Sequence, residues 1–178
     1  PDIRSASFLF AILLAPCRSP GYALYRIVSS KKEPTMTSIP FGKQDIPMNI
    51  ATLTGLEIMQ AFAAGKLPRP PISETMPMDP DLVEEGRVVF LATADERHTN
   101  PLGGVHGGFA ATVLDSVTGC ATHTMLEAGE SYGTTDLNIK MCRLLSFNNT
   151  LRVEGQVINT GHNLVITDGR LYAHATAN

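Results

Sequence analysis

The stretch HTNPLGGVHGGFAATVLDSVTGCA, residues 98–121, constrains the fold more than any other part of the chain. Five glycines or prolines precede Phe109 in this stretch, and the next glycine is Gly119. Such a change in composition marks a loop that leads into a helix. The unpaired N–H groups at a helix start carry positive potential and can stabilise an oxygen on which negative charge develops. The sequence therefore predicts a helix start of this kind at residues 106–108.

The composition is that of a folded, weakly acidic chain of 178 residues, a length that suits one domain with a buried core. Charged residues make up 17% and apolar residues 43%, as in globular rather than disordered proteins. A net charge of −3, with no face rich in Lys and Arg, argues against a nucleic-acid partner. The three cysteines form no C-x-x-C pair, which indicates free thiols and a cytoplasmic location.

The N-terminal residues differ in character from the remainder. Arg4 precedes an apolar run, residues 8–14, that resembles the hydrophobic region of a signal peptide but is too short to span a bilayer. We therefore expect no membrane partner. The chain begins with Pro1, and Met36 is a more ordinary protein start. We expect three parts: an extension outside the domain (residues 1–35), an N-terminal lead with a short helix (residues 36–71) and the main domain (residues 72–178).

The order of the predicted elements indicates an α+β fold. Thr54 and Glu57 form a capping-box pattern before an apolar stripe that ends at Gly65, which predicts a short helix. Pro77 and Pro80 restrict any strand nearby to a sheet edge. The remaining pattern predicts a long helix over residues 107–125 and strands over residues 86–94, 134–141, 150–159 and 164–175. We expect one long helix to cover one face of an antiparallel sheet.

The predicted long helix has an apolar face and a second face that carries one acid. Asp115 points roughly opposite to the apolar face, and its neighbours there are small or weakly polar. A solvated face usually carries Lys and Glu, but neither occurs between Phe109 and Met125. We therefore expect this face to be covered by another backbone or a ligand, and we take Asp115 as a candidate functional acid.

The spacing of Gly107 and Asp115 predicts that two subunits share a site. Asp115 lies eight residues beyond Gly107, which corresponds to about 12 Å along a helix axis. A carbonyl held about 3 Å from the Gly107 N–H cannot also meet the Asp115 side chain of the same helix. If both groups serve one reaction, they come from different chains, so we expect at least a homodimer.

These residues resemble the hotdog-fold thioesterases of the phenylacetate-pathway (PaaI-type) family. The resemblance rests on the pattern N-P-x-G-x-x-H-G-G-x6-D, formed by Asn100, Pro101, Gly103, His106, Gly107, Gly108 and Asp115. It extends less sharply from about Thr54 through the last strand. It implies a long central helix wrapped by a curved antiparallel sheet. It also implies subunits that pair edge to edge in dimers, which often double to a homotetramer.

The resemblance also implies roles for the residues of the loop and helix start. The Gly107 N–H would polarise the thioester carbonyl, which agrees with the helix-start argument above. Asn100 would orient the carbonyl or the attacking water, and His106 would brace the loop and the thioester. Gly108 would complete the substrate-binding segment. The implied substrate is an acyl- or aryl-CoA, hydrolysed to the free acid and CoA.

The remaining catalytic roles fall on the helix and the following strand. Asp115 of the facing subunit would act as general base or as nucleophile, and Thr134 would sit beside it and help to place the water. The implied reaction needs no metal and no cofactor beyond the CoA of the substrate. The chain departs from the family at the sheet edge: residues 168–173 lack the extra hairpin residues expected before a terminal strand, and residues 143–146 lack a proline. Both departures bear on assembly rather than on chemistry.

Other functions fit parts of the pattern. A hydratase or dehydratase of the same fold places its His after the acid, whereas here His106 precedes Asp115. A non-catalytic acyl-CoA-binding regulator would need a DNA-binding module, and the N-terminal half offers no basic recognition helix. A protein that acts only as an interaction module would not require an acid at Asp115.

Several of these side chains also have structural interpretations. His106 can cap the loop through its ring, Thr134 can be an ordinary strand residue, and the paired glycines can simply allow close packing. Cys120 and Cys142 lack a recognisable partner arrangement for thiol chemistry. Four histidines have no metal-ligand spacing, so we expect them to be surface or packing residues: His98, His123, His162 and His174.

Overall fold

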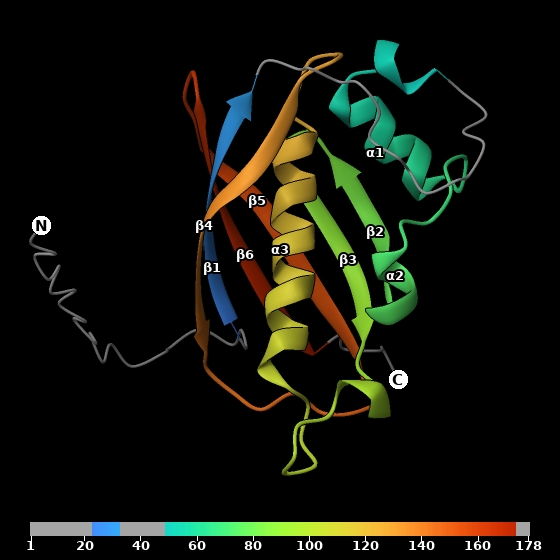
Figure 1. Cartoon of the computed structure of the whole chain (residues 1–178), viewed down its shortest axis with the longest axis vertical. Helices are drawn as coiled ribbons and strands as arrows, with labels where there is room; N and C mark the ends of the chain where they lie inside the picture. The colour runs from blue at the N-terminus through green and yellow to red at the C-terminus, as the bar shows by residue number, and fades with distance from the viewer. Residues whose placement is uncertain (1–22, 33–48, 174–178) are drawn as a thin grey trace, which may run out of the picture.

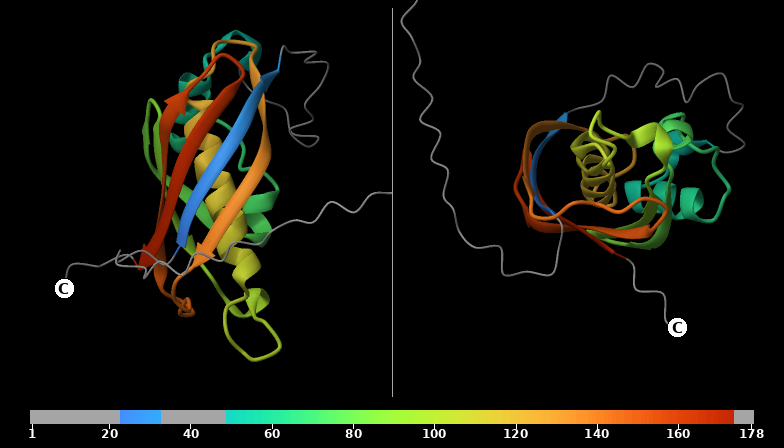
Figure 2. Two further views of the ribbon diagram at one scale, coloured as in Figure 1. Left: turned by 90° about the vertical axis from the view of Figure 1, so that its left-hand side faces the viewer. Right: turned by 90° about the horizontal axis from the view of Figure 1, so that it is seen from below.

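A curved sheet wraps around one long helix, α3 (Gly107–His123), in the computed structural model of the protein (Figure 1). The structure describes residues 23–32 and 49–173. Within these residues the sheet has six strands in the order β2-β3-β5-β6-β1-β4, and every neighbouring pair is antiparallel. The right-hand view of Figure 2, along α3, shows the sheet curling around the helix. The predicted α+β architecture is confirmed.

The other elements surround this central pair. The strands are β1 (Ala23–Lys32), β2 (Met78–Glu84), β3 (Arg87–Thr93), β4 (Ser131–Met141), β5 (Thr150–Thr160) and β6 (Leu164–Ala173). The short helices are η1 (Ile50–Thr52), α1 (Gly55–Ala63), α2 (Ile72–Thr75) and η2 (Glu96–His98). The predicted edge strand is confirmed as β2, which contains Pro80 and a register shift next to it. No described helix is long and apolar enough to cross a membrane.

The apolar face of α3 forms the core with the concave side of the sheet. Phe109, Val113 and Val117 are buried against β3, β5 and β6, as their helical spacing predicts. The helix and β5 approach each other closely at Gly155. A Cβ atom on Gly155 would lie 2.6 Å from the Val117 carbonyl oxygen, so only glycine fits there. This close contact fixes the height of α3 above the sheet.

The predicted short helix is α1, and both of its ends follow the predicted chemistry. The Thr54 hydroxyl accepts the Glu57 N–H at 3.3 Å, and the Glu57 carboxylate accepts the Thr54 N–H at 2.8 Å. Gly65, with φ +68°, follows the last turn, where a left-handed residue closes a helix. The helix packs on β2 and on α3. Its first residue accepts no larger side chain, because Gly55 lies against the His123 carbonyl.

The structure differs from the sequence prediction in residues 23–32. We predicted that residues 1–35 lie outside the domain, but residues 23–32 form β1 in the interior of the sheet. This strand pairs with β6 on one side and with β4 on the other. Its sequence, ALYRIVSSKK, contains the aromatic and β-branched residues that strands favour. The remaining residues of the predicted extension lie outside the described residues, as do residues 36–48 of the predicted lead.

A chain that lacks residues 1–35 tests the place of β1. The structure predicts a lower Tm, because β4 loses its described strand partner and β6 loses one of two. A loss of 1 kcal/mol would lower Tm by roughly 2–4 °C in a domain of this size. Thermal unfolding followed by circular dichroism measures the change, and a chain that lacks only residues 1–22 is the matched control. Equal Tm values for all three chains would place residues 1–35 outside the domain, as the sequence predicted.

Candidate active site

The loop before α3 closes on itself and carries Asn100. Thr99 and Val105 form an isolated antiparallel bridge, and the Asn100 N–H donates to the Gly104 carbonyl at 2.8 Å. The Asn100 side-chain oxygen accepts the N–H groups of Leu102 and Gly104, at 2.9 and 3.1 Å. Since Oδ1 holds the turn, Nδ2 is the side-chain atom left for a ligand, and it is a hydrogen-bond donor. A donor suits a carbonyl oxygen.

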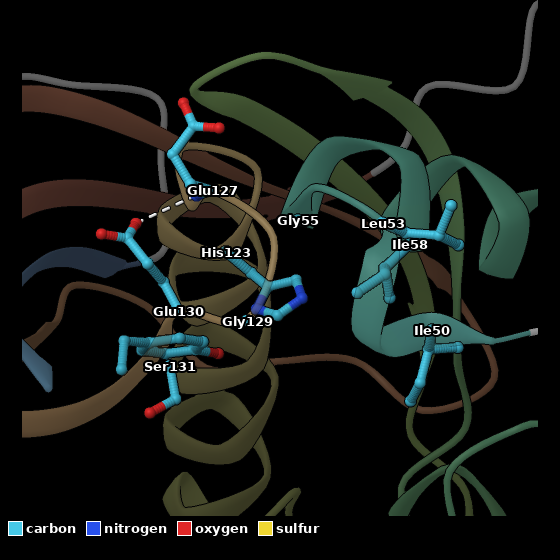
Figure 3. A pocket seen from close by; sticks show the side chains of 10 residues that line it. Ile50, Leu53, Gly55, Ile58, His123, Glu127, Gly129, Glu130 and Ser131 are labelled. Atoms are coloured by element: carbon cyan, nitrogen blue, oxygen red, sulfur yellow. Dashed lines mark hydrogen bonds between the residues drawn. The ribbon is translucent and has the colours of Figure 1, made fainter. Parts of the chain in front are cut away.

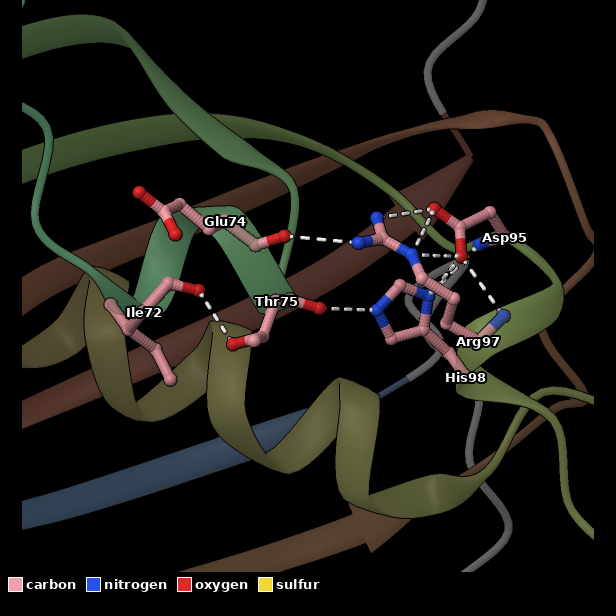
Figure 4. Close-up of polar contacts among 6 residues, drawn as sticks. All are labelled: Ile72, Glu74, Thr75, Asp95, Arg97 and His98. Atoms are coloured by element: carbon pink, nitrogen blue, oxygen red, sulfur yellow. Dashed lines mark hydrogen bonds and ion pairs between the residues drawn. The ribbon is translucent and has the colours of Figure 1, made fainter.

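His98 anchors this loop to α2 (Figure 4). Its Nε2 lies 2.6 Å from the Thr75 carbonyl, and its Nδ1 accepts the Asp95 N–H at 3.0 Å. These partners assign the proton to Nε2. The ring also packs edge-on against Phe109 with centroids 4.7 Å apart, and its backbone carbonyl accepts the His106 N–H. We expected His98 to be a surface or packing residue; it is a buried residue that also positions the loop.

An ion pair beside His98 adds a second link to α2. The Arg97 guanidinium donates to Asp95 at 2.7 Å and to the Glu74 carbonyl at 3.0 Å. Its hydrogen bonds hold the pKa of Asp95 at about 2, below the usual range. Both side chains of the pair are partly exposed, so we regard it as support for the loop geometry rather than as a major source of stability.

His106 caps the start of α3 with its own side chain. Its Nδ1 accepts the Gly108 N–H at 2.8 Å, and its carbonyl accepts the Phe109 N–H at 2.9 Å. Gly107 is exposed, and no acceptor within the described residues is assigned to its N–H. The residues 106–108 thus form the start of α3, where His106 and Gly107 are exposed, and Asn100 lies in the loop that leads into it. The cap also shows how His106 can brace the loop.

Asp115 lies on the other side of α3 from the core, next to β4. The Thr134 hydroxyl donates to the Asp115 carboxylate at 3.1 Å, so the predicted proximity of these two side chains is confirmed. Asp115 is half-buried and Thr134 is exposed. Because α3 is continuous from Gly107 to His123, the separation of about 12 Å between Gly107 and Asp115 along the axis also holds in the structure. One chain therefore carries two separate halves of the predicted site.

Cys120 is close to Asp115 but is unsuited to act as a nucleophile. Burial raises the pKa of the Cys120 thiol to about 12, and the nearby Asp115 carboxylate adds to the effect. A thiol with this pKa is protonated at neutral pH, and the thiolate is the reactive form. This supports the prediction that thiol chemistry is not used.

Comparison with known proteins agrees with this architecture. Residues 102–176 match the thioesterase superfamily. Acyl-coenzyme A thioesterase 13 of Homo sapiens is 29% identical over 91 residues, which cover 51% of this chain and 64% of that protein. The matched part thus spans somewhat less than two thirds of that relative.

Solved structures share the fold. A putative thioesterase from Ralstonia eutropha, described as a phenylacetic acid degradation-related protein, is 25% identical with a TM-score of 0.54, over 65% of this chain and 98% of that one. The PaaI protein of E. coli, from the phenylacetic acid degradation operon, has a TM-score of 0.52 at 18% identity, over 70% of this chain and 96% of that one. The chain thus shares the hotdog fold of these thioesterases, and both the predicted fold and the predicted resemblance to them are confirmed.

Replacing His106 measures how much its cap contributes to the stability of the fold. His106→Ala removes the acceptor for the Gly108 N–H and is expected to cost about 0.5–2 kcal/mol of stability, the usual loss for an N-cap. His106→Asn keeps a capping acceptor and is expected to retain most of that stability. Chemical denaturation measures both variants. An alanine variant as stable as the wild type would show that the cap contributes nothing to folding.

Proposed function

We propose that the protein hydrolyses the thioester of an acyl- or aryl-CoA to the free acid and CoA. The observation that carries this proposal is the Asp115 carboxylate, held by Thr134 on a helix face that otherwise bears small residues. A half-buried acid on such a helix face is typical of a catalytic site. The relative named acyl-coenzyme A thioesterase 13 supports the same substrate class.

The helix start would stabilise the charge that develops on the thioester carbonyl. When the carbonyl carbon becomes tetrahedral, its oxygen becomes an oxyanion, and the Gly107 N–H at the positive end of α3 would donate to it. The Asn100 amide, whose Nδ2 is not used in the turn, would donate to the same oxygen and orient it. His106 would brace the segment through its cap to Gly108.

Asp115 would supply the base or the nucleophile. As general base, its carboxylate takes a proton from a water molecule whose oxygen attacks the carbonyl carbon; the carbon–sulfur bond then breaks, and the CoA thiolate takes up a proton. As nucleophile, the carboxylate displaces the thiolate directly, and water then hydrolyses the resulting anhydride. Thr134 would fix the carboxylate in either case. These steps use water and protein groups alone, so we propose that no metal or other cofactor takes part.

The site would be completed by a second copy of the chain. The two halves lie about 12 Å apart along one helix, whereas a reacting carbonyl needs both within about 3 Å. Within the described residues β4 pairs only with β1, which leaves its outer edge available for a partner strand. Leu137 and Met141 of β4 are half exposed, and Leu144 just beyond is 90% exposed. We propose a homodimer joined along this face, and a dimer of dimers as the full assembly.

Asp115→Asn tests the proposed chemistry. The substitution keeps the side-chain volume but removes the base or nucleophile, so thiol release from acyl-CoA esters should fall about 10²-fold or more, the usual scale of general-base catalysis. Asp168→Asn is the control, because Asp168 lies at the groove formed by Glu154, Gln156 and Arg170, away from Asp115. If Asp115→Asn keeps more than a tenth of wild-type thiol release, the assigned role is wrong.

Mixing two inactive variants tests the sharing of the site. One variant carries Asp115→Asn, and the other carries Asn100→Ala with His106→Ala. In a mixed dimer one site inherits both defects and the other inherits none. Random pairing of equal amounts gives about half mixed dimers, so roughly a quarter of wild-type activity should return. Absence of recovery in purified mixed dimers would show that each chain carries a complete site.

A further inference from the structure

The side chain of Tyr132 lies across α3 one helical turn beyond Asp115. Asp115 and Gly119 are four residues apart and therefore share a helix face, about 6 Å apart along the axis. A Cβ atom on Gly119 would lie 2.6 Å from the Tyr132 hydroxyl oxygen and 3.3 Å from the ring carbons Cε2 and Cζ. The Tyr132 ring thus rests on the backbone of α3 where any larger residue would displace it. Thr134, two residues along β4, points to the same helix and reaches Asp115.

Beyond Tyr132 lies a pocket at the other end of α3 (Figure 3). The pocket holds about 120 Å³ and is lined on one side by Ile50, Leu53 and Ile58. Tyr132 also lines it, and its ring lies 5.8 Å from the His123 ring, centroid to centroid. Burial lowers the pKa of His123, so the imidazole is neutral at neutral pH. For comparison, an apolar cavity of about 150 Å³ in another protein accommodates benzene.

The charge of the pocket rim indicates which part of a thioester substrate the pocket can bind. Glu127 and Glu130 line the pocket near the end of α3, on the side away from Leu53 and Ile58 (Figure 3). Their carboxylates repel the phosphates of CoA, whereas the isoleucine and leucine side chains favour hydrocarbon. The matching end of a thioester substrate is the far end of its acyl group.

Symmetry limits the paths that an acyl group can follow along this face. In the proposed dimer the carbonyl lies beside Asp115 of one chain and Gly107 of its partner. On the first chain, the α3 face that carries Asp115 extends toward Gly107 in one direction. That Gly107 belongs to the second site of the dimer, about 12 Å away. Toward Gly119, the face leads to the Tyr132 ring and then to the pocket. The acyl group of a bound substrate would therefore extend toward Tyr132.

We propose that Tyr132 limits the length of the acyl group, by closing the path along α3 between Asp115 and the apolar pocket. The inference rests on the proposed thioester hydrolysis and specifies its substrate class as short or compact acyl groups. Without the ring, the path joins the pocket, and a longer chain gains the apolar contacts of Ile50, Leu53 and Ile58. Tyr132 is in this sense a specificity-determining residue, and the acyl transfer itself does not require it.

The test compares Tyr132→Ala with Tyr132→Phe on acetyl-, butyryl-, octanoyl- and lauroyl-CoA, with kcat/KM from thiol release. In the wild type, kcat/KM should fall from butyryl- to octanoyl-CoA. In Tyr132→Ala the octanoyl-to-butyryl ratio should rise about tenfold or more, the discrimination that one or two methylene groups give in a hydrophobic pocket. Tyr132→Phe keeps the ring and should keep the wild-type profile. Tyr132→Leu, a milder loss of the ring, should shift the ratio in the same direction and serves if the alanine variant does not fold.

A binding measurement in the Asp115→Asn background separates this inference from the proposed chemistry. Octyl-CoA thioether, which cannot be hydrolysed, should bind at least tenfold more tightly by calorimetry when Tyr132→Ala is added, and butyl-CoA thioether should bind equally in both proteins. Ile58→Phe, which fills the pocket, should remove the gain. An unchanged octyl-to-butyl affinity ratio overturns the role of Tyr132, whatever the activity. A wild type that releases no thiol from any ester overturns the proposed hydrolysis instead.

Discussion

The contact between Gly155 of β5 and the Val117 carbonyl of α3 sets the geometry on which the molecule depends. It lets the helix sink into the concave face of the sheet, where Phe109, Val113 and Val117 are buried. A helix held this deeply can be wrapped by strands on both sides, so β4 runs beside its second face. That face consequently carries small residues and Asp115 rather than the Lys and Glu of a solvated helix. The same packing that forms the core therefore creates the candidate site.

The two ends of α3 have opposite chemical characters, and this polarity supports the proposed function. The N-terminus is exposed and glycine-rich, and the loop before it is held by His98 on the Thr75 carbonyl. In the proposed reaction its N–H groups would donate to the developing oxyanion. The C-terminal end lies under α1, with an apolar pocket and an acidic rim. In the proposed dimer a thioester would react between the helix start of one chain and Asp115 of its partner, and Tyr132 of the Asp115 chain stands between that acid and the apolar pocket.

The position of β1 links the sheet to the proposed assembly. Both neighbours of β1 run antiparallel to it, so β6 and β4 are parallel to each other. Residues 23–32 lie between these two strands in the sheet. They thereby support β4, the strand that carries Thr134 and Tyr132 and whose outer edge would meet a second chain.

The sequence by itself determined the features that depend on local spacing: the capping box of α1, the loop and start of α3, its apolar face, and the distance between Gly107 and Asp115. These follow from helix geometry and from the backbone preferences of Gly and Pro, which act within a few residues. Only the tertiary structure decided that His98 anchors the loop on Thr75, that residues 23–32 enter the sheet, and that Tyr132 covers Gly119. Each of these contacts joins elements that are far apart in the sequence. A local sequence pattern cannot predict which side chains will contact such distant elements. The packing of the chain determines these contacts, because the depth of α3 in the sheet fixes which residues lie beside each turn of the helix.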